Sequence, residues 1–135
     1  MMKKILIILT SLFLLTSCVL HSYEDLRSDN RTKLSKIRIG SSISEVEKIM
    51  GVLGADSDNY GNVGEKITNP YKKENIEHKG KYYRIYYYYT ERFGNNPWQM
   101  GVTPVIFESN GVVGTGWRTM ESLGLESPST TIKVR

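Results

Sequence analysis

Apolar residues follow three patterns along the chain, and each pattern predicts a different kind of element. An apolar run at the amino terminus is followed, after a polar segment, by apolar residues at spacings of three and four, which are typical of a helix packed on one side. Alternating residues and a tight-turn signal in the second half predict strands. We therefore expect an α+β domain behind an amino-terminal leader, with one short helix packed on a three-stranded antiparallel β-meander.

The helix is expected within residues 37–51. Ser42 precedes Glu45 by three residues, which is a capping box that satisfies backbone N–H groups at a helix start. Gly51 provides a helix end, because glycine adopts the left-handed conformation at little cost. The apolar residues that share one face are Ile43, Val46, Ile49 and Met50. A helix this short needs packing against a sheet to persist.

The first predicted strand, residues 81–90, is rich in tyrosine, which favours pleated strands. Alternation places Tyr83, Ile85, Tyr87 and Tyr89 on one face and Tyr82, Arg84, Tyr86 and Tyr88 on the other. Because both faces are aromatic, either both are covered or one presents tyrosines to a partner, a role that suits this amphipathic side chain. The candidate contacts are Tyr82, Tyr86, Tyr88 and, in the following loop, Trp98. The alternative is a half-exposed aromatic face with no specific role.

The other two strands are expected at residues 103–109 and 112–117. Asn110–Gly111 joins them and is the strongest short hairpin signal in the chain. Gly114 indicates a bulge or a close approach of two backbones in the second of these strands.

Two polar segments interrupt these patterns. Residues 19–36 carry charges of both signs and few aliphatic residues. We expect this segment to be a tether, part of which can form a helix. Residues 52–80 contain the turn signal Asn69–Pro70 and are longer than an ordinary connection of about 4–6 residues. This insertion is either an interaction loop or a flexible segment, and its lack of apolar anchors favours flexibility.

The leader has the organisation of a secretory signal. Lys3 and Lys4 precede the apolar run, which ends before roughly 20 residues, the length that a membrane-spanning helix needs. The sequence Leu-Thr-Ser-Cys at residues 15–18 resembles the lipobox of bacterial lipoproteins. This resemblance implies that Cys18 carries acyl chains such as palmitate and that residues 1–17 are absent from the mature protein. The alternative is a buried or incidental thiol.

An acylated Cys18 would anchor the protein to a membrane. Each buried methylene of an acyl chain contributes about 0.8 kcal/mol, so more than one chain gives stable attachment. Val19 follows the cysteine, where an aspartate would, by analogy with enteric bacteria, favour the inner membrane. We therefore expect an outer-membrane anchor facing the periplasm, with the inner membrane and the cell surface as the other placements.

Composition limits the partners of the mature domain. Removal of the leader from 135 residues lowers the basic residues from 18 to 16 against 14 acidic residues, a net charge of +2. This charge gives no clustered basic footprint, and nucleic acid is not expected as a partner. With a single cysteine the chain forms no intramolecular disulfide, so its stability must come from its core.

Catalytic signals are weak. The two histidines are His21 and His78, and the grouping of Glu74, Glu77 and His78 lacks the two-histidine helical face of a metalloprotease. Solvated charges explain these residues better than a metal site, and no serine lies in a nucleophile elbow. We expect a non-enzyme without cofactor or metal. An enzyme would instead require a deep pocket that joins His78 to a carboxylate.

The helix region resembles the opening of the SmpA/OmlA family of small outer-membrane lipoproteins. The matching residues are Ile37, Gly40, Ser42, Glu45, Val46, Ile49, Met50 and Gly51, with a second partial match at residues 105–107 and 111–113. Ser41 and Leu53 replace the usual Met and Pro of the family pattern, and the insertion at 52–80 is longer than the family keeps. The resemblance implies a role in or near outer-membrane β-barrel assembly.

These observations give the expected organisation and function. We expect a signal peptide at 1–17, a lipidated tether at 18–36, an α+β domain at 37–118 with its insertion, and a short helix or polar tail at 119–135. The expected function is a membrane-anchored, non-catalytic binding or scaffolding module of the cell envelope. The alternative is a periplasmic ligand-binding or enzyme-inhibitor module with another target.

Overall fold

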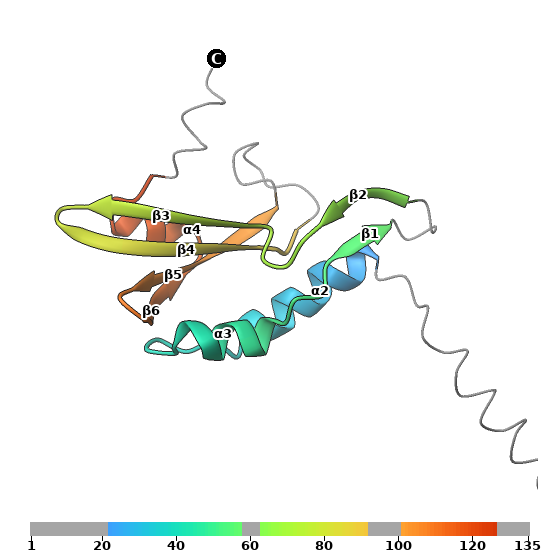
Figure 1. The fold of residues 1–135 in the computed structure, drawn as a ribbon, viewed down its shortest axis with the longest axis horizontal. Helices are drawn as coiled ribbons and strands as arrows, with labels where there is room; N and C mark the ends of the chain where they lie inside the picture. Colours follow the sequence, from blue (N-terminus) through green and yellow to red (C-terminus); the bar gives the residue numbers. More distant parts are fainter. Residues whose placement is uncertain (1–21, 58–62, 92–100, 127–135) are drawn as a thin grey trace, which may run out of the picture.

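The computed structural model describes residues 22–57, 63–91 and 101–126 and shows an α+β fold (Figure 1). Its helices are α2 (Tyr23–Leu34), α3 (Ile43–Met50) and α4 (Trp117–Ser122). Its strands are β1 (Ala55–Ser57), β2 (Val63–Ile67), β3 (Lys72–His78), β4 (Lys81–Tyr89), β5 (Val102–Glu108) and β6 (Gly111–Thr115). The main antiparallel sheet has the order β3-β4-β5-β6, and β1 and β2 form a separate antiparallel pair. The α+β class is confirmed, whereas the expected count of three strands in the main sheet is wrong.

The fourth strand of the sheet, β3, lies inside the segment expected to be a flexible insertion. That segment contains β1, β2 and β3, and the predicted turn at Asn69–Pro70 lies between β2 and β3. Exposed and half-buried side chains alternate along the whole of β3. Because most of the β3 side chains are polar, the sequence of this strand lacks a clear apolar alternation. The strand is instead stabilised by backbone pairing with β4 along its whole length.

Helix α3 begins and ends at its predicted caps. The Ser42 hydroxyl accepts from the Glu45 backbone N–H at 3.1 Å, and the Glu45 carboxylate accepts from the Ser42 N–H at 3.2 Å. Gly51 follows with a positive φ of 68°. Val46 and Met50 are fully buried and belong to one apolar cluster with residues of β4, β5 and β6.

Helix α2 occupies most of the segment expected to be a tether, and it is part of the folded domain. Leu26, Arg27 and Asn30 are buried on the side of α2 that packs against the rest of the molecule. Arg27 donates hydrogen bonds to the Glu24 carboxylate and to the Tyr89 hydroxyl. Burial opposes the charge of Arg27, but these hydrogen bonds outweigh it and raise its pKa, so the guanidinium stays charged.

The two faces of the main sheet are covered by different helices. In Figure 1, α2 and α3 lie on one side of the sheet and α4 lies on the other. The α4 side carries a second apolar cluster that includes Tyr83, Ile85, Tyr87 and Met120. The Trp117 indole N–H donates to the Val102 carbonyl at 2.8 Å and fixes the start of α4. The predicted alternation of β4 is therefore confirmed, since its odd and even positions enter separate clusters.

The expected irregularity in β6 is also present. The pairing of β5 with β6 shifts register between Ile106 and Phe107, which leaves an extra β6 residue beside Gly114. A Cβ at Gly114 would collide with the Thr119 side chain, so this position needs glycine for the close approach of α4.

Candidate functional site

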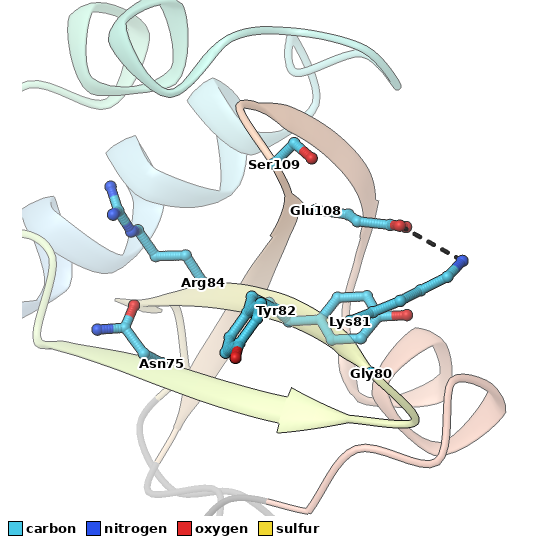
Figure 2. A pocket seen from close by; sticks show the side chains of 8 residues that line it. Asn75, Gly80, Lys81, Tyr82, Arg84, Glu108 and Ser109 are labelled. Carbon is cyan, nitrogen blue, oxygen red and sulfur yellow. Dashed lines mark ion pairs between the residues drawn. The ribbon is translucent and has the colours of Figure 1, made fainter.

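A shallow recess of about 610 Å³ opens at the end of the β3–β4 hairpin. The side chains that define it are Asn75 of β3, Lys81, Tyr82 and Arg84 of β4, and Glu108 and Ser109 at the end of β5 (Figure 2). Asn75 and Arg84 are directly opposite in the β3–β4 register, so both side chains stand on the same face of the sheet. The recess is thus formed by three neighbouring strands together with the turn residues Gly80 and Ser109.

The recess exists because the helices cover only part of one sheet face. Tyr82, Arg84, Tyr86 and Tyr88 alternate along β4 and share that face. Tyr86 and Tyr88 are 3% and 0% exposed beneath the helix side of the core, whereas Tyr82 is 71% exposed. The change from buried to exposed falls at Arg84, which is itself exposed. Beyond this point the aromatic face of β4 is open to a partner.

The chemistry of the recess suits binding. Lys81 Nζ lies 3.4 Å from Glu108 Oε1, an exposed pair that contributes little to stability. Arg84 takes part in no ion pair with any residue in the described ranges 22–57, 63–91 and 101–126. A guanidinium of this kind can bind a carboxylate through two parallel hydrogen bonds, and the neighbouring Tyr82 ring offers an apolar surface. The recess therefore combines one available cation with one exposed aromatic ring.

Of the three predicted contact residues that the structure describes, Tyr82 lies on the surface, whereas Tyr86 and Tyr88 do not. Tyr86 is buried and donates its hydroxyl proton to Glu47 Oε1 at 3.0 Å. Tyr88 is fully buried, and this burial, with the nearby Tyr86 and Glu47, raises the pKa of its hydroxyl. Both rings are part of the apolar core, because α3 packs over them. Trp98 and the predicted lipidation site Cys18 lie outside the described residues.

Arg84 and Asn75 were not among the predicted contacts. Arg84 interrupts a run of tyrosines, and a charge at that position is a signal that the surrounding face is not fully covered. Asn75 lay in the presumed insertion, and only its pairing with β4 brings it to the recess.

The residues weighed as a metal site do not converge. Glu74 points to the α4 side, where it accepts from the Tyr87 hydroxyl at 2.9 Å and pairs with Lys72. Glu77 and His78 are adjacent in β3, so their side chains leave on opposite faces. In the part of the chain that the structure describes, no three His, Cys, Asp or Glu side chains are grouped as a metal site would require.

Comparisons with models of protein families, with curated proteins and with solved structures found no match for this chain. None of the helices in the described ranges combines the length and the apolar character that crossing a membrane requires.

Proposed function

We propose that this chain is a lipid-anchored, non-catalytic binding module of the cell envelope. The observation that carries the proposal is the exposed Tyr82 ring beside Arg84, in a recess where the helices leave the sheet face uncovered. Large exposed aromatic residues next to arginine are typical of the residues that dominate protein interfaces. The anchor is the acylated Cys18 that the lipobox pattern of the leader favours.

The position of the chain's entry into the fold is compatible with this arrangement. Ser22 caps α2 and forms a bridge with Ser57 at the far end of β1. In Figure 1, this end lies opposite the β3–β4 turn along the long axis of the molecule. Three residues lie between Cys18 and Ser22, and the four Cα-to-Cα steps span at most about 14 Å when extended. A membrane at Cys18 would thus meet the α2 start, while the recess lies at the other end.

The partner class follows from the resemblance to the SmpA/OmlA family. We favour a scaffolding contact in or near outer-membrane β-barrel assembly, with the domain facing the periplasm. The second candidate is a periplasmic ligand-binding or inhibitor module, and the positive Arg84 in an open recess favours an acidic target in that case.

A photo-crosslinking side chain at Tyr82 tests the proposal in intact cells that express the full chain. We expect a covalent adduct with an envelope protein, and barrel-assembly subunits in that adduct would support the first candidate over the second. Ile39 is the matched control, because it is 73% exposed and lies outside the recess. Equal labelling from both positions, or labelling from neither, would overturn the recess as the contact site.

A further inference from the structure

The two edges of the main sheet differ in the backbone pairing of their edge strands, β6 and β3. Residues 40–42 cover the β6 edge, where the Gly40 N–H donates to the Val112 carbonyl at 2.8 Å and the Val112 N–H donates to the Ser41 carbonyl at 2.9 Å. At the other edge, β3 pairs with β4 alone among the strands of the described residues. Alternate residues of β3 therefore direct backbone N–H and C=O groups away from the sheet.

The side chains of β3 are complementary to a second copy of the same strand. In an antiparallel pairing centred on Asn75, each Asn75 faces its equivalent, and each Lys73 faces the Glu77 of the other copy. All three positions are exposed and lie on the recess side of the sheet. If one copy of β3 is shifted by two residues in either direction, both Lys73–Glu77 pairs are lost. Among the registers that keep the same sheet face of both copies on one side, the charges therefore favour this one.

The side chains around Lys73 and Glu77 leave both charges able to pair with a second copy of the strand. Glu77 forms no ion pair with any side chain in the described part of the molecule. Lys73 lies over the Tyr86 ring at 4.6 Å, and its Nζ is 3.8 Å from the Glu47 carboxylate, but its side chain is 54% exposed. Lys72, the other cation of the strand, is engaged with Glu74 on the opposite face.

We propose that two copies of this chain associate through antiparallel pairing of their β3 strands, which forms one continuous eight-stranded sheet. The arrangement is a two-fold symmetric contact in which the same surface is used on both copies. Asn75 lines the recess and lies at the symmetry axis, so the two recesses adjoin at the centre of the dimer. The antiparallel arrangement places the two Ser22 ends at opposite extremities, so a dimer with both ends anchored would lie along the membrane, with the two recesses between the anchors. This proposal does not depend on the lipid anchor.

Disulfide crosslinking tests the register in intact cells. Under mild oxidation, we expect Asn75→Cys to form a covalent dimer that runs at twice the monomer mass without reductant. Ile39→Cys is the exposed control, and the wild-type chain, whose only cysteine is Cys18, controls for that thiol. Crosslinking of Asn75→Cys no stronger than that of the two controls would overturn the pairing.

Charge exchange gives a second, independent test by sedimentation of the full chain in mild detergent. Glu77→Lys and Lys73→Glu each place like charges opposite one another, and we expect at least a tenfold loss of dimer affinity for each. Mixing the two variants restores opposite charges at both pairs, so a heterodimer should form. The double variant with both changes should also dimerise. Unchanged dimerisation in the single variants, failure of the mixture to associate, or a monomeric wild type would overturn the proposal.

Discussion

The Asn30 amide nitrogen donates to the side-chain oxygen of Asn69 across 3.0 Å, which joins α2 to the turn before β3. The same nitrogen donates to the Tyr89 carbonyl at 2.8 Å, and the Asn69 amide donates to the Met50 carbonyl at 3.1 Å. Both asparagines are buried, at 0% and 5% exposure. Two side chains thus connect α2, the end of α3 and the end of β4, which makes α2 part of the domain rather than a spacer.

Replacement of Asn30 by alanine is therefore expected to destabilise the whole domain. The change leaves the Tyr89 carbonyl and the Asn69 oxygen without this donor in a buried position, which costs about 2 kcal/mol in the free energy of unfolding. The loss is limited because Asn30 Oδ1 is buried without a hydrogen-bond partner. Urea unfolding of Asn30→Ala and of Asp29→Ala provides the measurement. Asp29 is exposed and, among the described residues, its side chain forms a surface pair with Lys33 alone, so its loss should change stability by less than about 0.5 kcal/mol. Equal effects of the two variants would contradict a docked α2.

A substitution at Gly54 tests whether the β1–β2 pair holds residues 52–57 against residues 63–67. A Cβ at this position would collide with the Ile67 carbonyl oxygen across the β1–β2 pair. Gly54→Ala should therefore lower the unfolding free energy by about 2–3 kcal/mol, because backbone atoms have to move. Gly111→Ala is the control, since its Cβ would meet its nearest atoms at 3.9 Å. A Gly54→Ala protein with the melting temperature of the control would indicate that the segment is a loose loop.

The raised pKa of the buried Tyr88 hydroxyl predicts a loss of stability at alkaline pH. Its pKa in the folded protein is raised by burial above the ordinary value of 10.0, so the unfolded chain ionises first as the pH rises. The stabilising contribution of the neutral hydroxyl is present below about pH 10 and is lost above it, by about 1 kcal/mol at pH 11. Tyr88→Phe removes this term and should lose less stability than wild type between pH 9 and 11. Chemical denaturation at each pH, with Tyr82→Phe as the control for removal of one hydroxyl, measures the difference. Parallel pH profiles for wild type and Tyr88→Phe would exclude this role.

Local signals predicted the elements that depend on local chemistry. The capping box at Ser42 and the glycine end at Gly51 occur where they were predicted, because each is determined by neighbouring residues. The predicted β5–β6 hairpin also forms, but Glu108 pairs with Gly111, so the two turn residues are Ser109 and Asn110 rather than Asn110 and Gly111. Helix α2 was expected only as a partly helical tether, and strand β3 was not recognised, because both segments are polar. The contacts that hold α2 include those of Arg27 and Asn30, whose partners Tyr89 and Asn69 are far away in sequence.

The candidate site was only partly predictable for a similar reason. Alternation correctly assigned Tyr82, Tyr86 and Tyr88 to one face of β4, but it carries no information about how far a helix extends over that face. The burial of Tyr86 and Tyr88 follows from the packing of α3, and the recess at Tyr82 begins where that cover ends.

The lipid anchor can be tested by mass spectrometry of the mature amino terminus. We expect the first residue to be Cys18 carrying two or three acyl chains, the protein to be recovered with the membrane fraction, and Cys18→Ser to abolish both properties. An intact Met1, or a water-soluble mature chain without acyl groups, would contradict the lipid anchor and with it the proposed role at the cell envelope.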